Sequence, residues 1–372
     1  MKVSSIDRLV RQLKMRQTAV SENEISALTG KILPPDEQAM EASRRHWNSL
    51  AKPLGSLGRL EQAVTQIAGI QRTAGVCIDR KALVVMCADN GVVAEGISQS
   101  GQDVTAIVAE NFLDEKSCVS IMCRKSGADI FPVDIGMAAD TPRVEKRKIA
   151  YATKNMARGP AMTRQQAADA VLTGIHKVQE LWSAGYQILA TGEMGIGNTA
   201  TSSAMTAVFL NVPVEEVTGR GAGLSSEGLA RKIRIIRQAI QVNRPDPADP
   251  LDVLAKTGGL DIAGLTGVFL GGACCGLPVV IDGIISSVAA LTAVRMAPAC
   301  ASYMLASHVS KEPAAQLLLS ALNKEAFLTC DMYLGEGSGA VALFPLLDLA
   351  VEVYGRMSSF GEAGIRPYER LS

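Results

Sequence analysis

Short, nearly continuous apolar runs that alternate with alanine-rich helical patterns are the feature that most constrains the fold of this chain. Runs that are apolar on both faces are typical of parallel strands that helices cover on each side. The pattern predicts an α/β protein with a Rossmann-like open parallel sheet and helices on both of its faces. The expected strands are Ala82–Ala88, Ile130–Ile135, Tyr186–Thr191, Pro278–Ile281 and a segment around Tyr303–Ala306.

Acidic or glycine-rich turns end several of these expected strands. In an open parallel sheet, ligands bind at the carboxyl ends of the strands, so these turns should lie together along one edge. We expect the functional site at that edge. The turns are Asp89–Gly91, Asp134–Gly136, Gly192–Glu193 and Asp282–Gly283.

The two ends of the chain differ from its middle. Residues 1–60 show polar helical periodicity, with a helix expected to begin near Asp36, and Leu346–Met357 is again helical. A chain of 372 residues is long enough for one large core and a small satellite domain. We therefore predict a small helical domain built from residues 1–60 and 346–372, and a large α/β catalytic domain of residues 61–345.

Charge and composition exclude several classes of partner. Lys and Arg together number 37, as do Asp and Glu, so the chain lacks the global field that attracts proteins to nucleic acid or anionic membranes. The longest apolar tract, Leu277–Met296, is interrupted by Asp282 and Arg295 and is not a membrane span. We expect small-molecule ligands, with no nucleic acid and no membrane.

The cysteines and histidines give no support for a metal site. The eight cysteines follow no metal-binding spacing, and most lie in apolar runs, as small core residues do in a reducing compartment. With only His46, His176 and His308 present, neither a zinc site nor a Ser-His-Asp triad is supported. The first residues contain no apolar signal region. We expect a cytoplasmic protein without a bound metal.

Two glycine-rich runs each contain one glutamate, and together they are the strongest chemical signal. Gly192–Thr199 contains Glu193, and Tyr333–Ala340 contains Glu336. Glycine lets the backbone approach a ligand closely, and a carboxylate in a partly dry pocket can have a pKa near working pH. We interpret the pair as a general base and a second carboxylate that orients the acceptor or stabilises charge. Two tight structural turns are the alternative, since glycine is foremost a turn residue.

Glycine loops before helices also predict an anion site. Gly192–Thr199 lacks the Gly-Lys-Ser/Thr ending of a Walker A loop and the spacing of a dinucleotide fingerprint. It follows an expected strand and precedes a helix, where free backbone N–H groups and the helix dipole favour a phosphate. Gly219–Ser226 repeats the pattern, with Lys232 in the following helix as a point charge. A mononucleotide or sugar phosphate is the favoured ligand; a simple connection and a solvated surface lysine are the alternatives.

Six separated segments of the chain are informative through their order and spacing. They are Lys52–Glu61, Ala88–Val92, Asn155–Met162, Gly192–Thr199, Pro278–Gly283 and Leu334–Ala340. Their order and spacing resemble those of the nicotinate-nucleotide:dimethylbenzimidazole phosphoribosyltransferase family, which activates the lower ligand of cobalamin. The resemblance runs from about Pro34 to about Gly364.

This resemblance implies the transfer of phosphoribose from nicotinate mononucleotide to an aromatic acceptor, with inversion at the anomeric carbon, to give an α-riboside 5′-phosphate and nicotinate. The donor pyridinium is already a cationic leaving group, so no metal and no cofactor are expected, and the enzyme must orient the acceptor and remove its proton. By match to the family motifs, Glu336 is the base and Glu193 is the second carboxylate near the acceptor. The donor and its phosphate would contact Gly195, Gly197, Asn198, Gly219, Arg220, Gly221, Lys232 and Ser307.

At the acceptor site the chain departs from the usual family pattern. It has Asn90 where histidine is usual, Tyr333 where arginine is usual, and Val108 near a position that often holds glutamine. A site without a hydrogen-bonding group cannot reject an acceptor that fails to pair with it. We therefore expect acceptors to include 5,6-dimethylbenzimidazole, related bases and phenols. The residues assigned to acceptor binding are Asn90, Ser100, Val108, Tyr333 and Leu334.

Three hypotheses about the whole protein follow. Some family members act as paired, related subunits that transfer to phenols, so we expect a homodimer or a heterodimer with a related subunit. The leading hypothesis is an active phosphoribosyltransferase. A non-catalytic partner subunit is the second, which the presence of Glu193, Glu336 and Lys232 disfavours. A nicotinamide-dependent oxidoreductase is the third, weakened by the absent dinucleotide fingerprint.

Overall fold

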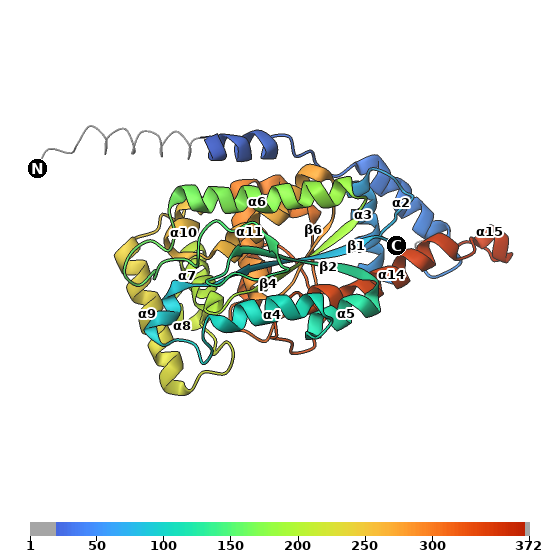
Figure 1. Cartoon of the computed structure of the whole chain (residues 1–372). Helices are drawn as coiled ribbons and strands as arrows, with labels where there is room; N and C mark the ends of the chain where they lie inside the picture. The colour runs from blue at the N-terminus through green and yellow to red at the C-terminus, as the bar shows by residue number, and fades with distance from the viewer. Residues whose placement is uncertain (1–19, 369–372) are drawn as a thin grey trace, which may run out of the picture.

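A parallel sheet forms the centre of the structure, a computed structural model that describes residues 20–368 (Figure 1). Within these residues the strands are β1 (Lys81–Ala88), β2 (Ala128–Gly136), β3 (Glu145–Lys146), β4 (Ile188–Met194), β5 (Val279–Ile281) and β6 (Met304–Ala306). Their order in the sheet is β3-β2-β1-β4-β5-β6, and every neighbouring pair is parallel. This is the strand order of a doubly wound Rossmann fold.

Strand β1 lies inside the sheet, and all of its residues are buried. Alternate side chains of a strand point to opposite faces, so Val84 and Met86 belong to one hydrophobic core and Leu83 and Val85 to the other. Helices cover both cores, as Figure 1 shows for α6 on one side of the sheet and for α4 and α5 on the other. The first core is covered by α6 (Arg164–Ser183), α11 (Leu260–Cys275) and α12 (Ile284–Met296), and the second by α4 (Asp103–Leu113), α5 (Cys118–Ser126) and α14 (Ser338–Arg356).

The predicted fold class is confirmed, and each of the five expected strands is present with bounds shifted by a few residues. The sequence did not indicate β3, because Glu145 and Lys146 form a two-residue edge strand that carries charge instead of an apolar run. Such a strand is stabilised by pairing with β2 and has no hydrophobic pattern of its own.

Helices from the two ends of the chain pack together. The helix expected near Asp36 is α2 (Glu37–Ser49), and Asp36 caps it by accepting a hydrogen bond from the Ala39 amide at 2.9 Å. Together with α3 (Arg59–Gln71) it meets the second half of α14. Between these helices lies a third hydrophobic core, which contains Trp47, Leu50, Val64, Ala350 and Tyr354. Residues 1–19 and 369–372 of the predicted helical domain lie outside the described part of the chain.

Helix α14 is notable for its apolar composition. Among the described residues it is the one helix long and apolar enough to cross a membrane, and half of its most apolar window is buried inside the protein. It packs beside β4 and α5, where one face contributes Leu343, Phe344 and Leu347 to the second core. A core helix of this kind passes the same length and composition test.

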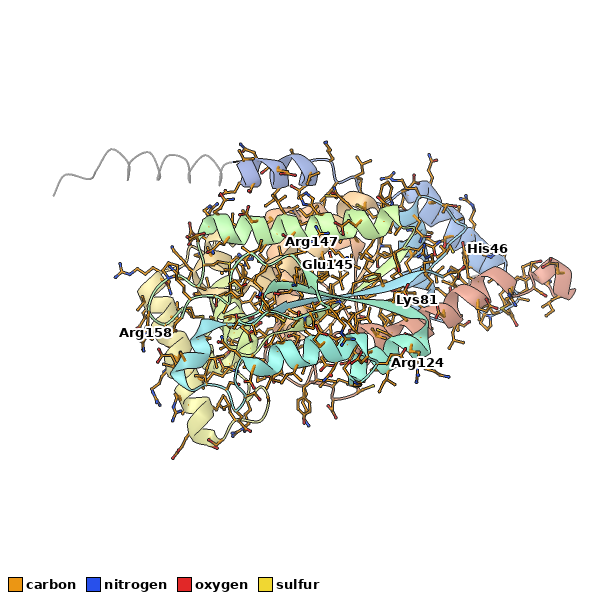
Figure 2. The ribbon with its side chains drawn as sticks, viewed as in Figure 1. His46, Lys81, Arg124, Glu145, Arg147 and Arg158 are labelled. Atoms are coloured by element: carbon orange, nitrogen blue, oxygen red, sulfur yellow. The ribbon has the colours of Figure 1, made fainter. Side chains whose placement is uncertain are left out.

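The carboxyl ends of the strands and their amino ends lie on opposite sides of the molecule. Figure 2 shows Lys81, at the start of β1, on the right, and Arg158, which donates to Glu95 just beyond the end of β1, on the left. Most of the remaining helices are on the left side, around the carboxyl ends (Figure 1). The remaining elements are η1 (Gly91–Glu95), α7 (Asn198–Leu210), α8 (Val214–Val217), α9 (Ser226–Asn243), α10 (Pro250–Thr257), η2 (Pro298–Tyr303), α13 (Ala315–Ala321) and α15 (Phe360–Ala363).

Candidate active site

A cleft of about 720 Å³ opens at the carboxyl ends of β4, β5 and β6. Segments 193–199, 282–286 and 308–310, which follow these strands, form one side of it. The loops 97–99, 220–224 and 331–336 and the start of α5 complete the wall. The site therefore lies at the edge of the sheet where the sequence places it.

The two glycine-rich runs that each contain a glutamate meet in this cleft. A β-carbon on Gly335 would lie 2.4 Å from the Glu193 Oε1, and one on Gly192 would lie 2.4 Å from the Glu336 carbonyl oxygen. Gly335, Glu336 and Gly337 all have left-handed backbone conformations, with φ of 86°, 63° and 94°. A β-carbon at Gly192, Gly335 or Gly337 would collide with neighbouring atoms, so only glycine at these three positions leaves room for the turn against the end of β4.

Glu193 belongs to a buried pair of carboxylates. The side-chain amide of Asn198 donates to Glu193 Oε2 and, at 3.0 Å, to Asp261 Oδ2. Burial raises the pKa of Glu193 to about 8 and that of Asp261 to about 7, and the mutual repulsion of the two carboxylates adds to the shift of Glu193. Burial therefore favours the protonated form of Glu193 near neutral pH, although its carboxyl group accepts from the Asn198 side-chain amide and the Glu336 backbone amide, which lower the pKa.

Glu336 has a different environment. Its side chain is only partly buried, and its Oε2 has no hydrogen-bond partner within the described residues. Burial raises its pKa, a hydrogen bond from the Val119 backbone at the start of α5 lowers it, and the charge of Asp282 raises it further. A carboxylate in the wall of a cleft, with one oxygen that is buried and unsatisfied, is suited to accept a proton from a bound molecule.

The other end of the cleft is built for an anion. Helix α7 begins at Asn198 after Gly197, so the positive end of its dipole lies at the cleft; the amides of Asn198 and Ala200 donate to the Gly195 and Gly197 carbonyls at 3.3 and 3.0 Å. Lys232 is 1% exposed as a residue. Its Nζ donates to Thr199 Oγ1 at 2.8 Å and to the Gly219 carbonyl at 3.1 Å. Burial lowers the pKa of Lys232 to about 8. A phosphate beside the ammonium would favour its charged form.

Glu312 also lines the anion end. Burial raises its pKa, the charge of Lys232 lowers it, and its Oε2 has no hydrogen-bond partner within residues 20–368. The anion end thus contains one buried cation, Lys232, one buried acid and the exposed cation Arg220, so the backbone amides of the glycine loops would share in stabilising a bound phosphate.

Comparisons with known proteins identify the family of the chain. The family model described as phosphoribosyltransferase matches residues 32–365. The chain belongs to this family. It is similar to the nicotinate-nucleotide–dimethylbenzimidazole phosphoribosyltransferase of Acetivibrio thermocellus, at 48% identity over 90% of this chain and 95% of the relative. The enzyme of the same name from Ruminiclostridium cellulolyticum is also 48% identical, over 90% of this chain and 96% of the relative.

A solved structure resembles the whole fold. The crystal structure of CobT from Thermus thermophilus matches with a TM-score of 0.84 and 37% sequence identity, covering 89% of this chain and all of that chain. The family predicted from the six sequence segments is thus confirmed, and so is the prediction that the chain is a phosphoribosyltransferase.

The cleft brings together most of the residues that the sequence assigned to the site, and leaves some outside. Asn90 is fully buried beneath the glycine loop, where its side-chain amide donates to the Ile196 carbonyl at 3.4 Å. Ser100 and Val108 are partly buried outside the lining. Gly219 and Ser307 do not line the cleft, but each contacts a residue that does. The Gly219 carbonyl accepts from Lys232, and the Ser307 hydroxyl lies 3.0 Å from His308 Nδ1. The assigned residues that line the cleft are Glu193, Gly195, Gly197, Asn198, Arg220, Gly221, Lys232, Tyr333, Leu334 and Glu336.

Several cleft residues were not assigned from the sequence. Asp282, which lines the cleft, follows β5 and was visible as part of an acidic turn; Asp261 lies behind the lining in the first turn of the apolar helix α11, where it accepts from Asn198, and has no local signal. His308, which the sequence analysis gave no chemical role, is 4% exposed and lines the cleft. Near the two glutamates the wall is apolar and rich in sulfur, with Cys118, Met122, Met194, Met332 and Leu334.

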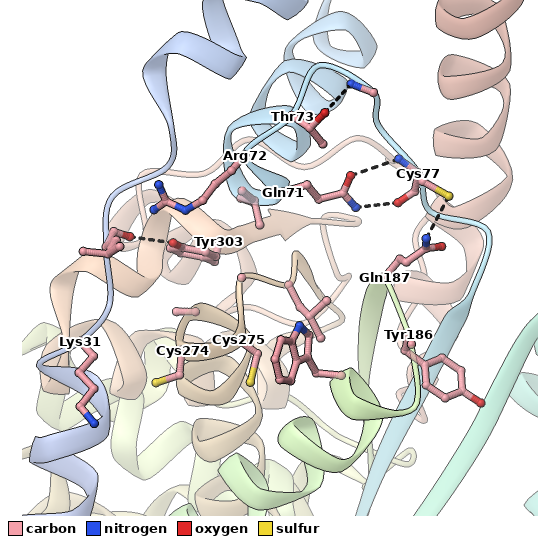
Figure 3. Close-up of a pocket in the computed structure, with 18 residues that line it drawn as sticks. Lys31, Gln71, Arg72, Thr73, Cys77, Tyr186, Gln187, Cys274, Cys275 and Tyr303 are labelled. Atoms are coloured by element: carbon pink, nitrogen blue, oxygen red, sulfur yellow. Dashed lines mark hydrogen bonds between the residues drawn. The ribbon is translucent and has the colours of Figure 1, made fainter.

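A second cavity, of about 600 Å³, lies at the opposite edge of the sheet (Figure 3). Gln71 and Cys77 exchange two hydrogen bonds there, of 2.6 and 3.1 Å, and the Gln187 amide donates to the Cys77 sulfur at 3.0 Å. These amides are satisfied within the protein, and the cavity contains no arrangement of acids and bases like that of the cleft. Across the described residues, no group of three or more His, Cys, Asp or Glu side chains is placed to hold a metal ion.

Proposed function

We propose that this protein transfers phosphoribose from nicotinate mononucleotide to an aromatic acceptor, giving an α-riboside 5′-phosphate and nicotinate for cobamide synthesis. The observation that supports it most is the position of Glu336 and Glu193 in the same cleft as a buried lysine and two glycine loops. Relatives that are 48% identical over nine tenths of the chain are named for this reaction.

The residues of the cleft divide into an anion end and an acceptor end. The positive N-terminal end of α7, the loop at Gly221 and the ammonium of Lys232 would hold the donor phosphate. The ribose would then extend toward Glu336, and the acceptor would lie against the sulfur-rich apolar wall. Holding both reactants in line accounts for much of the rate, because it replaces an encounter between two free molecules.

The chemical step then requires one base and no redox change. Glu336 removes the proton of the acceptor as the acceptor atom bonds to the anomeric carbon. The bond from that carbon to the pyridinium nitrogen breaks, and its electron pair neutralises the ring, so nicotinate leaves without protonation. Glu193, held protonated by burial and by Asp261, donates a hydrogen bond that orients the acceptor.

The acceptor range is the finer part of the proposal. Val108 lies outside the lining, so the case for a tolerant pocket depends on exposed Tyr333 and Leu334 and on the polarisable wall of Cys118 and Met122. An apolar wall of this kind discriminates weakly between aromatic rings of similar size. We propose that bases related to dimethylbenzimidazole, and phenols, are accepted.

We also propose three properties of the whole molecule. The protein acts in the cytoplasm, as a homodimer or with a related subunit. Its chain divides into a large catalytic part, residues 61–345, and a small helical part, residues 1–60 and 346–372, supported by the separate core of Trp47, Leu50, Ala350 and Tyr354, against which Val64 of the large part packs. Helix α14 spans that boundary and connects the helical part to Glu336.

One incubation tests the reaction. The protein is mixed with nicotinate mononucleotide and one of several acceptors, and release of nicotinate and formation of the riboside phosphate are followed by chromatography. We expect both products in equal amounts, only when an acceptor is present. A protein that releases no nicotinate with any acceptor would instead support the non-catalytic subunit. Release without an acceptor would indicate a hydrolase.

A further inference from the structure

Helix α14 begins directly after the Glu336 turn and lacks a cap of its own. Its N-cap residue is Gly337, which has no side chain to accept the free amides. Asp282, from the end of β5, supplies the missing acceptor. Its Oδ1 accepts from the amides of Gly339 at 2.8 Å and Ala340 at 3.0 Å, and its Oδ2 accepts from Gly337 at 3.2 Å.

Asp282 is itself fixed in place. Its side chain and backbone together are 4% exposed, and its backbone amide donates to Ser286 Oγ at 3.1 Å. The Ser286 hydroxyl lies 2.6 Å from the hydroxyl of Thr191, which donates to the Val280 carbonyl at 2.8 Å. The cap is thus anchored to two neighbouring strands of the rigid sheet.

The turn that Asp282 caps is strained. Glu336 has a side chain and yet adopts a left-handed φ of 63°, a conformation that is unfavourable for any residue other than glycine. Such a conformation persists only when the surrounding structure fixes it. The three hydrogen bonds to Asp282 fix the residues that follow Glu336, and Gly192 lies against its carbonyl group.

We propose that Asp282 is the positioning residue for Glu336, holding the catalytic carboxylate over the acceptor by capping α14 from the adjacent strand. This inference rests on the proposed function. Asp282 acts through Glu336 and is given no contact with the reacting atoms.

The charge of Asp282 gives this role a second signature. The titratable groups around it are Glu336 on the turn, Glu193 at the end of β4 and His308 after β6. Its negative charge raises the pKa of both glutamates, while burial raises the pKa of Asp282 itself and His308 opposes that rise. Replacing Asp282 by asparagine removes that charge, so Glu336 should lose its proton at a lower pH.

The experiment compares Asp282→Asn with Asp134→Asn as a matched control. Asp134 is likewise a buried carboxylate near the end of a strand, and it accepts from the Met137 amide at 2.9 Å and pairs with Lys148 at 3.2 Å, away from the Glu336 turn. Both variants lose a buried charge and a turn contact. Only Asp282→Asn should change the chemistry.

We expect Asp282→Asn to lower kcat at least tenfold, with the donor KM within twofold of wild type, and to move the acidic limb of the kcat profile to lower pH. In the Glu336→Gln background the same change should lower kcat less than threefold, because the group that it positions is already inactive. Asp134→Asn should keep the wild-type kcat and pH profile at whatever stability it retains.

The outcomes that contradict the proposal are equally specific. A kcat for Asp282→Asn within twofold of wild type, or a full additional loss in the Glu336→Gln background, would leave Asp282 as a structural cap only. If Asp282→Asn does not fold, Ser286→Ala, which removes the hydroxyl that the Asp282 amide contacts, is compared in the same way and should shift kcat in the same direction.

A measurement without turnover separates this proposal from the proposed function. With carbon-13 label in the glutamate carboxyl groups and Glu336→Gln to assign the signal, NMR follows the titration of Glu336 in wild type and in Asp282→Asn. We expect a lower titration midpoint in the variant, even if the wild type transfers phosphoribose to no acceptor. An unchanged midpoint would overturn the proposal, whatever the activity.

Discussion

The α-carbon of Gly192 lies against the carbonyl group of Glu336, so closely that a β-carbon on residue 192 would sit 2.4 Å from the oxygen. The end of β4 and the turn before α14 therefore approach each other by direct backbone contact. This contact places the Glu193 side chain beside Gly335, and so fixes the spacing of the two carboxylates.

We predict that Gly192→Ala displaces the Glu336 turn and lowers kcat by about 100-fold, the usual scale for misplacing a catalytic group by about 1 Å. Gly355→Ala is the matched control, because a β-carbon at that helical position meets no atom within 4 Å. The control should keep its activity and gain up to about 1 kcal/mol of stability. Steady-state kinetics and thermal unfolding of both variants test this, and a Gly192→Ala enzyme with normal kcat would show that the turn can move freely.

Glu336→Gln should keep the fold and lower kcat by about 100-fold or more, since the amide cannot accept the acceptor proton. Donor affinity should be unchanged, because Glu336 lies away from the anion end. In the wild type, activity should fall as pH decreases through the pKa of Glu336, which burial holds above its ordinary value of 4.5. A kcat profile that is flat from pH 8 to pH 4.5, or a Glu336→Gln enzyme with wild-type turnover, would exclude this base.

Glu193 and Asp261 should lower the free energy of unfolding as pH rises, whereas a carboxylate in a salt bridge raises it. Their pKa values are raised to about 8 and 7, so the folded state binds protons that the unfolded state releases above about pH 4.5. Their favourable contribution is complete below the unfolded pKa and is lost as pH rises to about 8. Glu193→Gln or Asp261→Asn should therefore raise the free energy of unfolding at pH 8, on the order of a few kcal/mol, and have little effect near pH 4.5. Urea unfolding at the two pH values measures this, and an equal effect at both would contradict it.

The fold was predictable because the buried strands are apolar on both faces. Residues 82–88 and 186–191 need no partner to be recognised as strands of a parallel sheet. The edge strand Glu145–Lys146 has no such pattern and exists through its pairing with β2. The sequence therefore predicts the apolar strands, including the edge strand β6, better than the charged edge strand β3.

The site was predictable where one segment contains both the glycines and the functional group. Glu193, Glu336 and Lys232 lie in such segments or directly after them. Asp261 and Asp282 act on those residues from other elements, so their roles arise only when the chain is folded. Val108 was assigned to the acceptor site from a family position, yet it is partly buried on α4 and packs against the second core outside the cleft lining. A position near a family motif does not fix which way a side chain points.

Lys232→Gln should raise the donor KM by about 10- to 100-fold and leave kcat nearly unchanged, because it removes a charge-assisted contact worth about 1.5–3 kcal/mol. Arg234→Gln removes an exposed cation from the same helix and serves as the control. Because burial lowers the pKa of Lys232 to about 8, donor affinity should fall up to tenfold per pH unit above pH 8 in the wild type. Isothermal titration calorimetry with nicotinate mononucleotide measures both effects. A pH dependence that persists unchanged in Lys232→Gln would place the phosphate elsewhere.

The lining of the cleft predicts a broad range of aromatic acceptors. The wall near Glu336 offers methionine and cysteine sulfur and the exposed rings and chains of Tyr333 and Leu334, so we expect phenol and adenine to be used as well as dimethylbenzimidazole. A phenol has a pKa of about 10 and remains protonated near neutral pH, so its transfer needs the base at least as much as transfer to a ring nitrogen does. Its rate should rise more steeply with pH and should fall at least as far in Glu336→Gln. A competition assay with the three acceptors at two pH values, with and without any related partner subunit, tests this expectation. Product from dimethylbenzimidazole alone in every preparation would show that the apolar wall is selective after all.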